Sequence, residues 1–188
     1  MSETPVTVPF VSFRPMEREL DADLRGAFAR VLDNSWYIEG KEDAAFEAAF
    51  ADYCGAKYCV GCGNGLDALV LILKAMGIGP GDEVITSAYT YTASASPVCH
   101  VGAKLVLVDT LPGSYEMDPQ QLSAAFTERT KAVIPVDVGG ILADYDTIFA
   151  IAEDKKALFT PEGDLQRQIG RVAVVADGAH SFGAERHG

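Results

Sequence analysis

The sequence predicts an α/β fold with a mostly parallel sheet flanked by helices. From residue 83 onward, short runs rich in valine and isoleucine alternate with segments of helical period. These runs are apolar without regular polar alternation, which is typical of buried parallel strands covered on both faces. The chain has 188 residues, 48% of them hydrophobic, so it can bury a substantial core. We therefore expect one α/β layer system.

The first expected elements are helices. Apolar residues recur at three- and four-residue spacing over residues 16–32, which predicts an amphipathic helix. A turn is expected at 34–40. A second helix is expected over 41–54, because its aromatic and alanine residues share one face and Gly55 suits its C-terminal end.

The pattern then begins to alternate. Residues 56–63 (AKYCVGCG) predict a buried strand that runs into a turn, and this turn leads into a helix over 66–76. A strand is expected at 83–87 and a helix at 91–101.

The second half continues the alternation. Further buried strands are expected at 104–109, 130–136 and 171–177, with helices at 119–125 and 145–155 between them. Residues 157–170 (ALFTPEGDLQRQIG) interrupt the connection between the last expected helix and the last expected strand. They are interpreted as a surface insertion with a helical turn.

Charge and hydropathy exclude several classes of partner. The chain carries 15 lysine and arginine residues against 27 acidic ones, a formal net charge of −12, which disfavours nucleic acid and anionic membranes. Apolar runs such as 172–176 are too short to span a bilayer, and the N-terminus lacks a basic stretch followed by an apolar one. We expect a soluble cytoplasmic protein with no nucleic-acid or membrane partner.

The cysteines allow two interpretations. Cys54, Cys59 and Cys62 have the C-x4-C-x2-C spacing of plant-type iron–sulfur proteins, with Cys99 as a fourth candidate ligand. The preferred interpretation is that Cys59 and Cys62 pack as small hydrophobic residues in the expected strand and turn. We expect no metal.

Loops that follow the strands are the candidate site, because ligands of open α/β sheets bind beyond the carboxyl ends of the strands. The loop 61–66 (GCGNGL) follows an expected strand and opens a helix, where backbone N–H groups and the helix dipole favour an anion. Leu66 does not fit a dinucleotide fingerprint, and no Lys-Ser/Thr pair follows as in a P-loop. The loop is either a phosphate cradle or a tight turn that needs its glycines.

Two further loops carry chemically useful side chains. Asp177 ends an apolar strand, where a carboxylate needs donors or a cation such as a protonated pyridine nitrogen; a helix N-cap is the alternative. His180 either orients such a ligand or Asp177, or is an ordinary buried imidazole. An aromatic ring in 87–92 either stacks on a planar ligand or packs in the core.

Together these stretches resemble the DegT/DnrJ/EryC1/StrS family of pyridoxal-phosphate-dependent aminotransferases, which aminate nucleotide-linked keto-sugars. The likeness covers nearly the whole chain, and it is specific because of the order and spacing of its pieces. These pieces are 36–40 (WYIEG), 46–60, 63–69 (GNGLDAL), 79–85 (GPGDEVI), 89–95 (YTYTASA), 102–109, 135–140 (PVDVGG) and 177–183 (DGAHSFG).

The resemblance implies roles for six residues. The implied cofactor-binding residues are Asn64, Gly65, Leu66, Tyr91, Asp177 and His180. The amides of Gly65 and Leu66 would hold the cofactor phosphate, and Tyr91 would stack on the pyridine ring. Asp177 would pair with the pyridine nitrogen, and His180 would lie near the ring oxygen.

The sequence departs from the family pattern at three places. Leu66 replaces a residue that usually carries a hydroxyl, Gly178 stands where alanine is usual, and the insertion 157–170 is longer than the usual link. The family's Schiff-base lysine comes after the Asp-x-x-His stretch, and no lysine of this chain has that context. The lysines are Lys41, Lys57, Lys74, Lys104, Lys131, Lys155 and Lys156.

The resemblance therefore implies the partial large domain of a fold-type-I pyridoxal-phosphate-dependent transferase. Residues 1–40 would be an N-terminal helical segment and residues 41–188 an incomplete cofactor-binding domain without the small C-terminal domain. The implied activity moves an amino group, by family habit from glutamate, to a nucleotide-linked keto-sugar. The implied partners are the remaining C-terminal part of the enzyme and a second copy of the chain. The alternative is a catalytically inactive remnant that binds pyridoxal phosphate or assists assembly.

Overall fold

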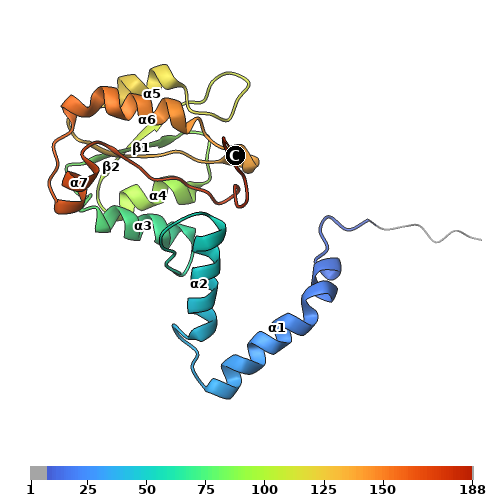
Figure 1. Ribbon diagram of the computed structural model, residues 1–188. Helices are drawn as coiled ribbons and strands as arrows, with labels where there is room; N and C mark the ends of the chain where they lie inside the picture. The colour runs from blue at the N-terminus through green and yellow to red at the C-terminus, as the bar shows by residue number, and fades with distance from the viewer. Residues whose placement is uncertain (1–7, 188) are drawn as a thin grey trace, which may run out of the picture. The chain divides into compact units, whose positions relative to one another are not determined.

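The computed structural model describes residues 8–187 and divides the chain into two compact units, with the boundary between Gly61 and Cys62 (Figure 1). Each unit is described by itself. Within residues 8–187, no helix is both long and apolar enough to cross a membrane.

The first unit holds two helices, α1 (Arg14–Asn34) and α2 (Lys41–Tyr53), which confirms both expectations. The amphipathic stripe of α1 contacts no core, because no residue of this helix is buried. Helix α2 ends as its sequence predicts: Gly55 follows the C-cap residue with φ of 62°, a conformation that glycine adopts at little cost. Arg30 and Glu42 join the two helices through an ion pair of 2.6 Å.

The strand expected over residues 56–63 is wrong. Between residues 56 and 63 the chain is irregular, and 82% of the Val60 side chain is exposed. A strand needs a neighbour to receive its backbone hydrogen bonds. Among residues 8–187 this segment belongs to no sheet, so apolar composition alone does not make it a strand. Its cysteines are not buried either.

The second unit contains a four-stranded parallel sheet in the order β2-β1-β3-β4. The strands are β1 (Glu83–Ser87), β2 (Lys104–Val108), β3 (Thr130–Ile134) and β4 (Ala173–Val174). Every residue of β1 and β3 is buried, as expected for the two central strands. The expectation that β2 is buried is wrong, since it lies at the sheet edge and Leu107 is 55% exposed. Strand β4 is shorter than predicted, although a bridge between Val136 and Asp177 continues the pairing beyond it.

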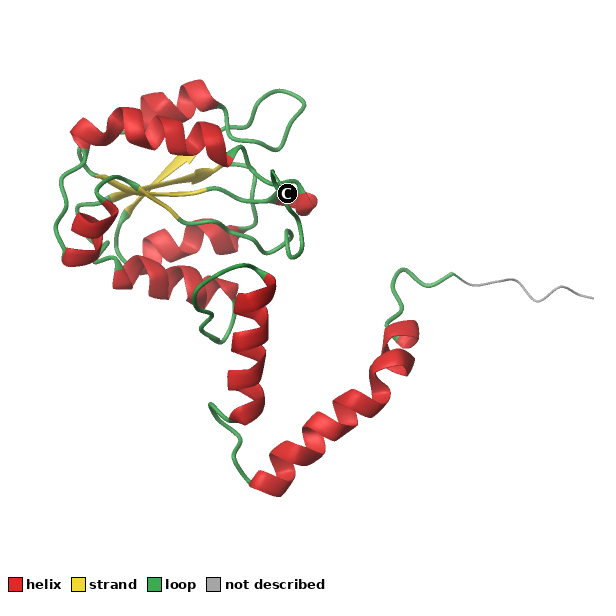
Figure 2. Cartoon of the chain, viewed as in Figure 1, coloured by secondary structure: helices red, strands yellow, loops and turns green. Residues whose placement is uncertain are grey.

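Helices cover both faces of this sheet (Figure 2). The helices α3 (Gly65–Ala75) and α4 (Thr92–His100) lie on one face, and α5 (Pro119–Ala125) and α6 (Tyr145–Asp154) on the other (Figure 1). Two apolar cores result, one containing Leu73 and Val98 and the other Leu122 and Ile148. The predicted α/β class is therefore confirmed.

The insertion at 157–170 is attached to the sheet unit by polar contacts. It includes the end of a short 3-10 turn, η2 (Lys155–Leu158), and the helix α7 (Asp164–Ile169), which is the expected helical turn. Gln166 Nε2 donates to the Met76 carbonyl at 2.8 Å. The buried Lys131 ammonium donates to the Thr160 carbonyl at 2.6 Å and pairs with Glu162 at 3.1 Å.

Glu83 is a buried carboxylate at the N-terminal end of β1, opposite the carboxyl edge of the sheet. Its side chain is 2% exposed and accepts hydrogen bonds from Lys104 Nζ, Arg129 Nη2 and Thr127 Oγ1 at 2.9, 2.6 and 2.6 Å. Burial works to raise the pKa of Glu83, but these three donors outweigh it and hold the pKa below its ordinary value of 4.5.

A lowered carboxyl pKa predicts a specific loss of stability in acid. The stabilisation from ionised Glu83 is complete above pH 4.5 and is lost as the pH falls below that value through the folded-state pKa. Glu83→Gln should therefore be less stable at pH 7, by about 1–3 kcal/mol, and should lose less further stability on acidification. Urea unfolding at pH 7 and at pH 3.5 measures both effects. Glu128→Gln, a change of the same kind at an exposed neighbour, serves as the control; parallel pH profiles for wild type and Glu83→Gln would contradict the prediction.

Candidate functional site

A cavity of about 820 Å³ lies at the carboxyl edge of the sheet in the second unit. Its walls come from the start of α3, the loop after β1 with the first turn of α4, the segment after β3, and the segment after β4. This is the edge where ligands of open α/β sheets bind. All six residues named from the sequence line it: Asn64, Gly65, Leu66, Tyr91, Asp177 and His180.

The start of α3 offers the cavity unpaired backbone donors. Asn64 is the N-cap; its Oδ1 accepts from the Asp67 N–H at 2.9 Å, and its Nδ2 donates to Asp67 Oδ2 at 2.8 Å. The N–H groups of Gly65 and Leu66, in the first turn, have no acceptor inside the helix itself. A helix start of this kind favours a negatively charged group by its N–H donors and its dipole.

Asp177 is held in place by both its backbone and its side chain. Its N–H donates to the Pro135 carbonyl at 2.9 Å, and its carbonyl accepts from the Asp137 N–H at 3.1 Å. The carboxylate accepts from Ser94 Oγ at 2.6 Å and from the Ala179 N–H at 3.2 Å. No helix begins between residues 178 and 187, so the alternative role as a helix N-cap is wrong.

Tyr91 and His180 both face solvent rather than core. Tyr91 is the N-cap residue of α4 and is 79% exposed, which excludes the core-packing alternative for this ring. His180 is also exposed, which excludes the buried-imidazole alternative. Its Nδ1 accepts from the Gly139 N–H at 3.2 Å, so a neutral ring carries its proton on Nε2 and can donate it to a ligand. Gly139, in the turn η1 (Val138–Gly140), has φ of 65°.

Three polar residues at this edge were given no individual role from the sequence, although Thr90 and Asp137 lie within stretches that it indicates. Thr90 and Ser94 line the cavity, and Ser94 is buried beneath it. Asp137 belongs to a loop that follows a strand, but its carboxylate turns inward and is 3% exposed. Ser94 lies three residues after Tyr91 in a helix, and this spacing is the signal that places it on the same side as Tyr91.

Other candidate features do not join this site. Asp109 also follows a strand, but it does not line the cavity and accepts from the Thr110 N–H at 2.8 Å. Within residues 8–187, no three histidine, cysteine or acidic side chains come together as a metal site. The four cysteines are free thiols.

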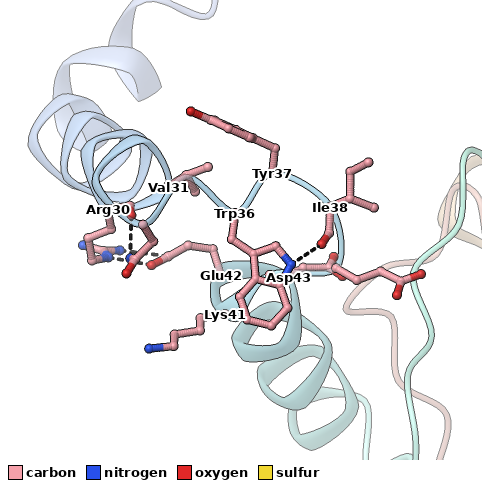
Figure 3. A pocket seen from close by; sticks show the side chains of 11 residues that line it. Arg30, Val31, Trp36, Tyr37, Ile38, Lys41, Glu42 and Asp43 are labelled. Atoms are coloured by element: carbon pink, nitrogen blue, oxygen red, sulfur yellow. Dashed lines mark hydrogen bonds and ion pairs between the residues drawn. The ribbon is translucent and has the colours of Figure 1, made fainter.

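A second cavity, of about 890 Å³, lies in the first unit between α1 and α2 (Figure 3). Figure 3 shows the Arg30 guanidinium against Glu42 and the Trp36 indole against the Ile38 carbonyl. The polar groups of these four residues are therefore already engaged. The cavity in the second unit is therefore the stronger candidate for a ligand-binding site.

The fold and the cavity of the second unit define a class of protein. It is an α/β domain whose site suits a planar, phosphate-bearing cofactor. The family model described as the DegT/DnrJ/EryC1/StrS aminotransferase family matches residues 18–188, and the chain belongs to this family.

Named relatives agree with this assignment. The chain is 42% identical over 181 residues to a UDP-2-acetamido-2-deoxy-3-oxo-D-glucuronate aminotransferase of Pseudomonas aeruginosa, covering 96% of this chain and 46% of that protein. It matches DesV of S. venezuelae with a TM-score of 0.80 and 38% identity, over 93% of this chain and 43% of that one. The PLP-form of Spr1654 from Streptococcus pneumoniae, described as a sugar aminotransferase, matches with a TM-score of 0.79 and 38% identity, over 83% and 41%. The chain spans about half the length of the curated relatives that it matches.

Proposed function

We propose that this chain forms the cofactor-binding part of a pyridoxal-phosphate-dependent aminotransferase that acts on a nucleotide-linked keto-sugar. The observation that carries the proposal is the gathering of all six residues named from the sequence around one cavity. Family membership and the sugar-nucleotide aminotransferases among the relatives support the substrate class. Glutamate is the proposed amino donor, as the resemblance implies.

The residues of the cavity fit this cofactor. The start of α3, with Asn64, Gly65 and Leu66, offers the N–H groups that a phosphate requires. The exposed ring of Tyr91 is available to stack on the pyridine, and the fixed carboxylate of Asp177 is an acceptor for a protonated ring nitrogen. Bound pyridoxal phosphate would supply an electron sink, which ionised Asp177 strengthens by keeping the ring nitrogen protonated.

His180, three residues after Asp177 in the same segment, completes the proposed set. Because its Nδ1 accepts from Gly139, its Nε2 is left as the donor for the ring oxygen of the cofactor. Leu66 supplies no hydroxyl, so at this position phosphate binding depends on the backbone alone.

No lysine lines this cavity within residues 8–187. We therefore assign no catalytic residue to the chain, and the Schiff-base amine would come from a polypeptide segment outside these 188 residues. Residues 1–40 would form an N-terminal helical segment, and residues 41–188 would form the cofactor-binding domain. The segment that supplies the Schiff-base amine would form the small domain. The exposed apolar stripe of α1 supports pairing with a second copy, as a homodimer.

This proposal predicts reversible rather than covalent binding by the chain. Pyridoxal phosphate should bind saturably, and borohydride treatment at one equivalent of cofactor should leave the main species at 20.0 kDa, because no lysine within residues 8–187 lines the cavity to form a site-specific reducible bond. Fluorescence titration and intact mass measure the two results. A stoichiometric cofactor adduct confined to one of the seven lysines, or transaminase turnover by the 188 residues alone, would overturn the assignment.

Because no lysine of the described residues lines the cavity, a second candidate is also favoured, an inactive module that binds pyridoxal phosphate or assists assembly. The two candidates differ in the protein isolated from its native cells. A lysine-bearing segment in the same polypeptide or in a stable complex supports the aminotransferase, whereas a 20.0 kDa protein without such a partner supports the inactive module.

A further inference from the structure

Ser94 is the buried polar residue that connects the separate parts of the cavity. It lies in the first turn of α4 and is 1% exposed, yet it belongs to the cavity wall. Its Oγ lies 2.6 Å from Asp177 Oδ2 and 2.7 Å from Thr90 Oγ1. Asp177 is 83 residues further along the chain, so this contact joins helix α4 to the segment after β4.

The chemistry of these groups sets the direction of the hydrogen bonds. An ionised carboxylate can only accept, so Ser94 donates its single hydroxyl proton to Asp177. Ser94 Oγ then accepts from Thr90 Oγ1, and the relay runs from Thr90 through Ser94 to Asp177. The distance of 2.6 Å is typical of a charge-assisted O–H···O⁻ bond, and the neutral hydroxyl bond from Thr90 to Ser94 strengthens it by polarising the Ser94 hydroxyl.

The same residue also fixes the backbone next to the exposed aromatic ring. The Ser94 N–H donates to the Tyr91 carbonyl at 3.1 Å. Asp177 Oδ1 is held independently by the Ala179 N–H, so each carboxylate oxygen has one protein donor and retains capacity for another. Ser94 thus contacts both Asp177 and the backbone of Tyr91, the residue proposed to stack on the ring.

We propose that Ser94, supported by Thr90, is a positioning residue that orients Asp177 toward the ring nitrogen of the cofactor. This inference rests on the proposed function. Its specific consequence is that Ser94 acts through one atom of the ligand, the ring nitrogen, and not through the general stability of the cavity.

The test compares pyridoxal phosphate with an analogue that has carbon in place of the ring nitrogen. Ser94→Ala should weaken binding of pyridoxal phosphate by about tenfold, and binding of the carbon analogue by less than about twofold. Thr90→Val, which keeps the side-chain shape, should show the same selectivity with a smaller loss. Ser96→Ala is the matched control, because Ser96 donates to its own helix at the Thr92 carbonyl and should affect neither ligand.

The outcomes separate this inference from the proposed function. Equal losses for both ligands, or no loss, in Ser94→Ala would overturn the positioning role while leaving the proposed function intact. If Ser94→Ala does not fold, the same comparison with Thr90→Val decides the question. Wild-type chain that binds neither ligand would instead overturn the proposed cofactor site, and the inference with it.

Discussion

Asp177→Ala is expected to weaken the binding of pyridoxal phosphate by about 100-fold, the largest effect of any single change in the cavity. The carboxylate is fixed by Ser94 and Ala179 before any ligand enters, so its orientation costs little on binding. In the proposed site, removing it would leave the protonated ring nitrogen without its charged acceptor. Fluorescence or absorbance titration of the purified chain measures the change.

Asp109 supplies the matched control for this prediction. Both acids follow strands of the same sheet at the same edge, but Asp109 is exposed and lies outside the cavity wall. Asp109→Ala should therefore bind the cofactor as wild type does. Tyr91→Ala should weaken binding by less than Asp177→Ala, about tenfold, because stacking on an exposed ring is worth less than a charged hydrogen bond. Unchanged affinity in both Asp177→Ala and Tyr91→Ala would show that the cofactor site lies elsewhere.

The sequence predicts the elements of the second unit well because its local and long-range patterns agree. The apolar runs at β1 and β3 are central strands buried on both faces, so their composition reflects their surroundings. Two expectations failed for the opposite reason: that residues 56–63 form a strand, and that β2 is buried. Val60 and Leu107 are apolar but exposed, since one lies outside any sheet of the described residues and the other lies at a sheet edge. Distant segments decide whether an apolar run is paired in a sheet and whether its side chains are covered. Local composition does not reveal either.

The candidate site was likewise predictable from the sequence only in part. Gly65, Tyr91 and Asp177 lie in loops after strands, and a general rule of α/β sheets brings such loops together. That rule treats Asp177 and Asp109 alike. The family resemblance singles out Asp177, and the structure adds the physical difference, because Asp177 lines the cavity and contacts Ser94, 83 residues away, whereas Asp109 does neither. Asp137 also shows that position after a strand is not enough to predict a ligand contact. Its position suggests such a contact, but its carboxylate points into the protein.

Asp137 organises the loops that carry the site from within the protein. Its Oδ1 accepts from the Ala143 N–H at 2.9 Å and from the Tyr145 hydroxyl at 2.8 Å, and its Oδ2 accepts from Ser181 Oγ at 2.7 Å. Burial raises the pKa of Tyr145 above its ordinary value, and the hydrogen bond to Asp137 and the charge of that residue raise it further. The phenol therefore stays protonated as a donor. Asp137 thus ties the start of α6 to the segment that follows Asp177.

Asp137→Ala is consequently expected to destabilise the protein by about 3–5 kcal/mol, because three donors lose their acceptor in a buried setting. Asp137→Asn should cost much less, since an amide oxygen can still accept from Ala143 and Tyr145 while the amide nitrogen donates to the Ser181 hydroxyl. Urea unfolding at pH 7 measures both variants, and hydrogen exchange at the Ala143 amide reports the local contact. Equal stability of the alanine and asparagine variants would mean that hydrogen bonding at Asp137 is not what holds these loops. If the predicted difference is found, the inward-facing acid stabilises the loop from which Asp177 and His180 reach the cavity, while making no ligand contact of its own.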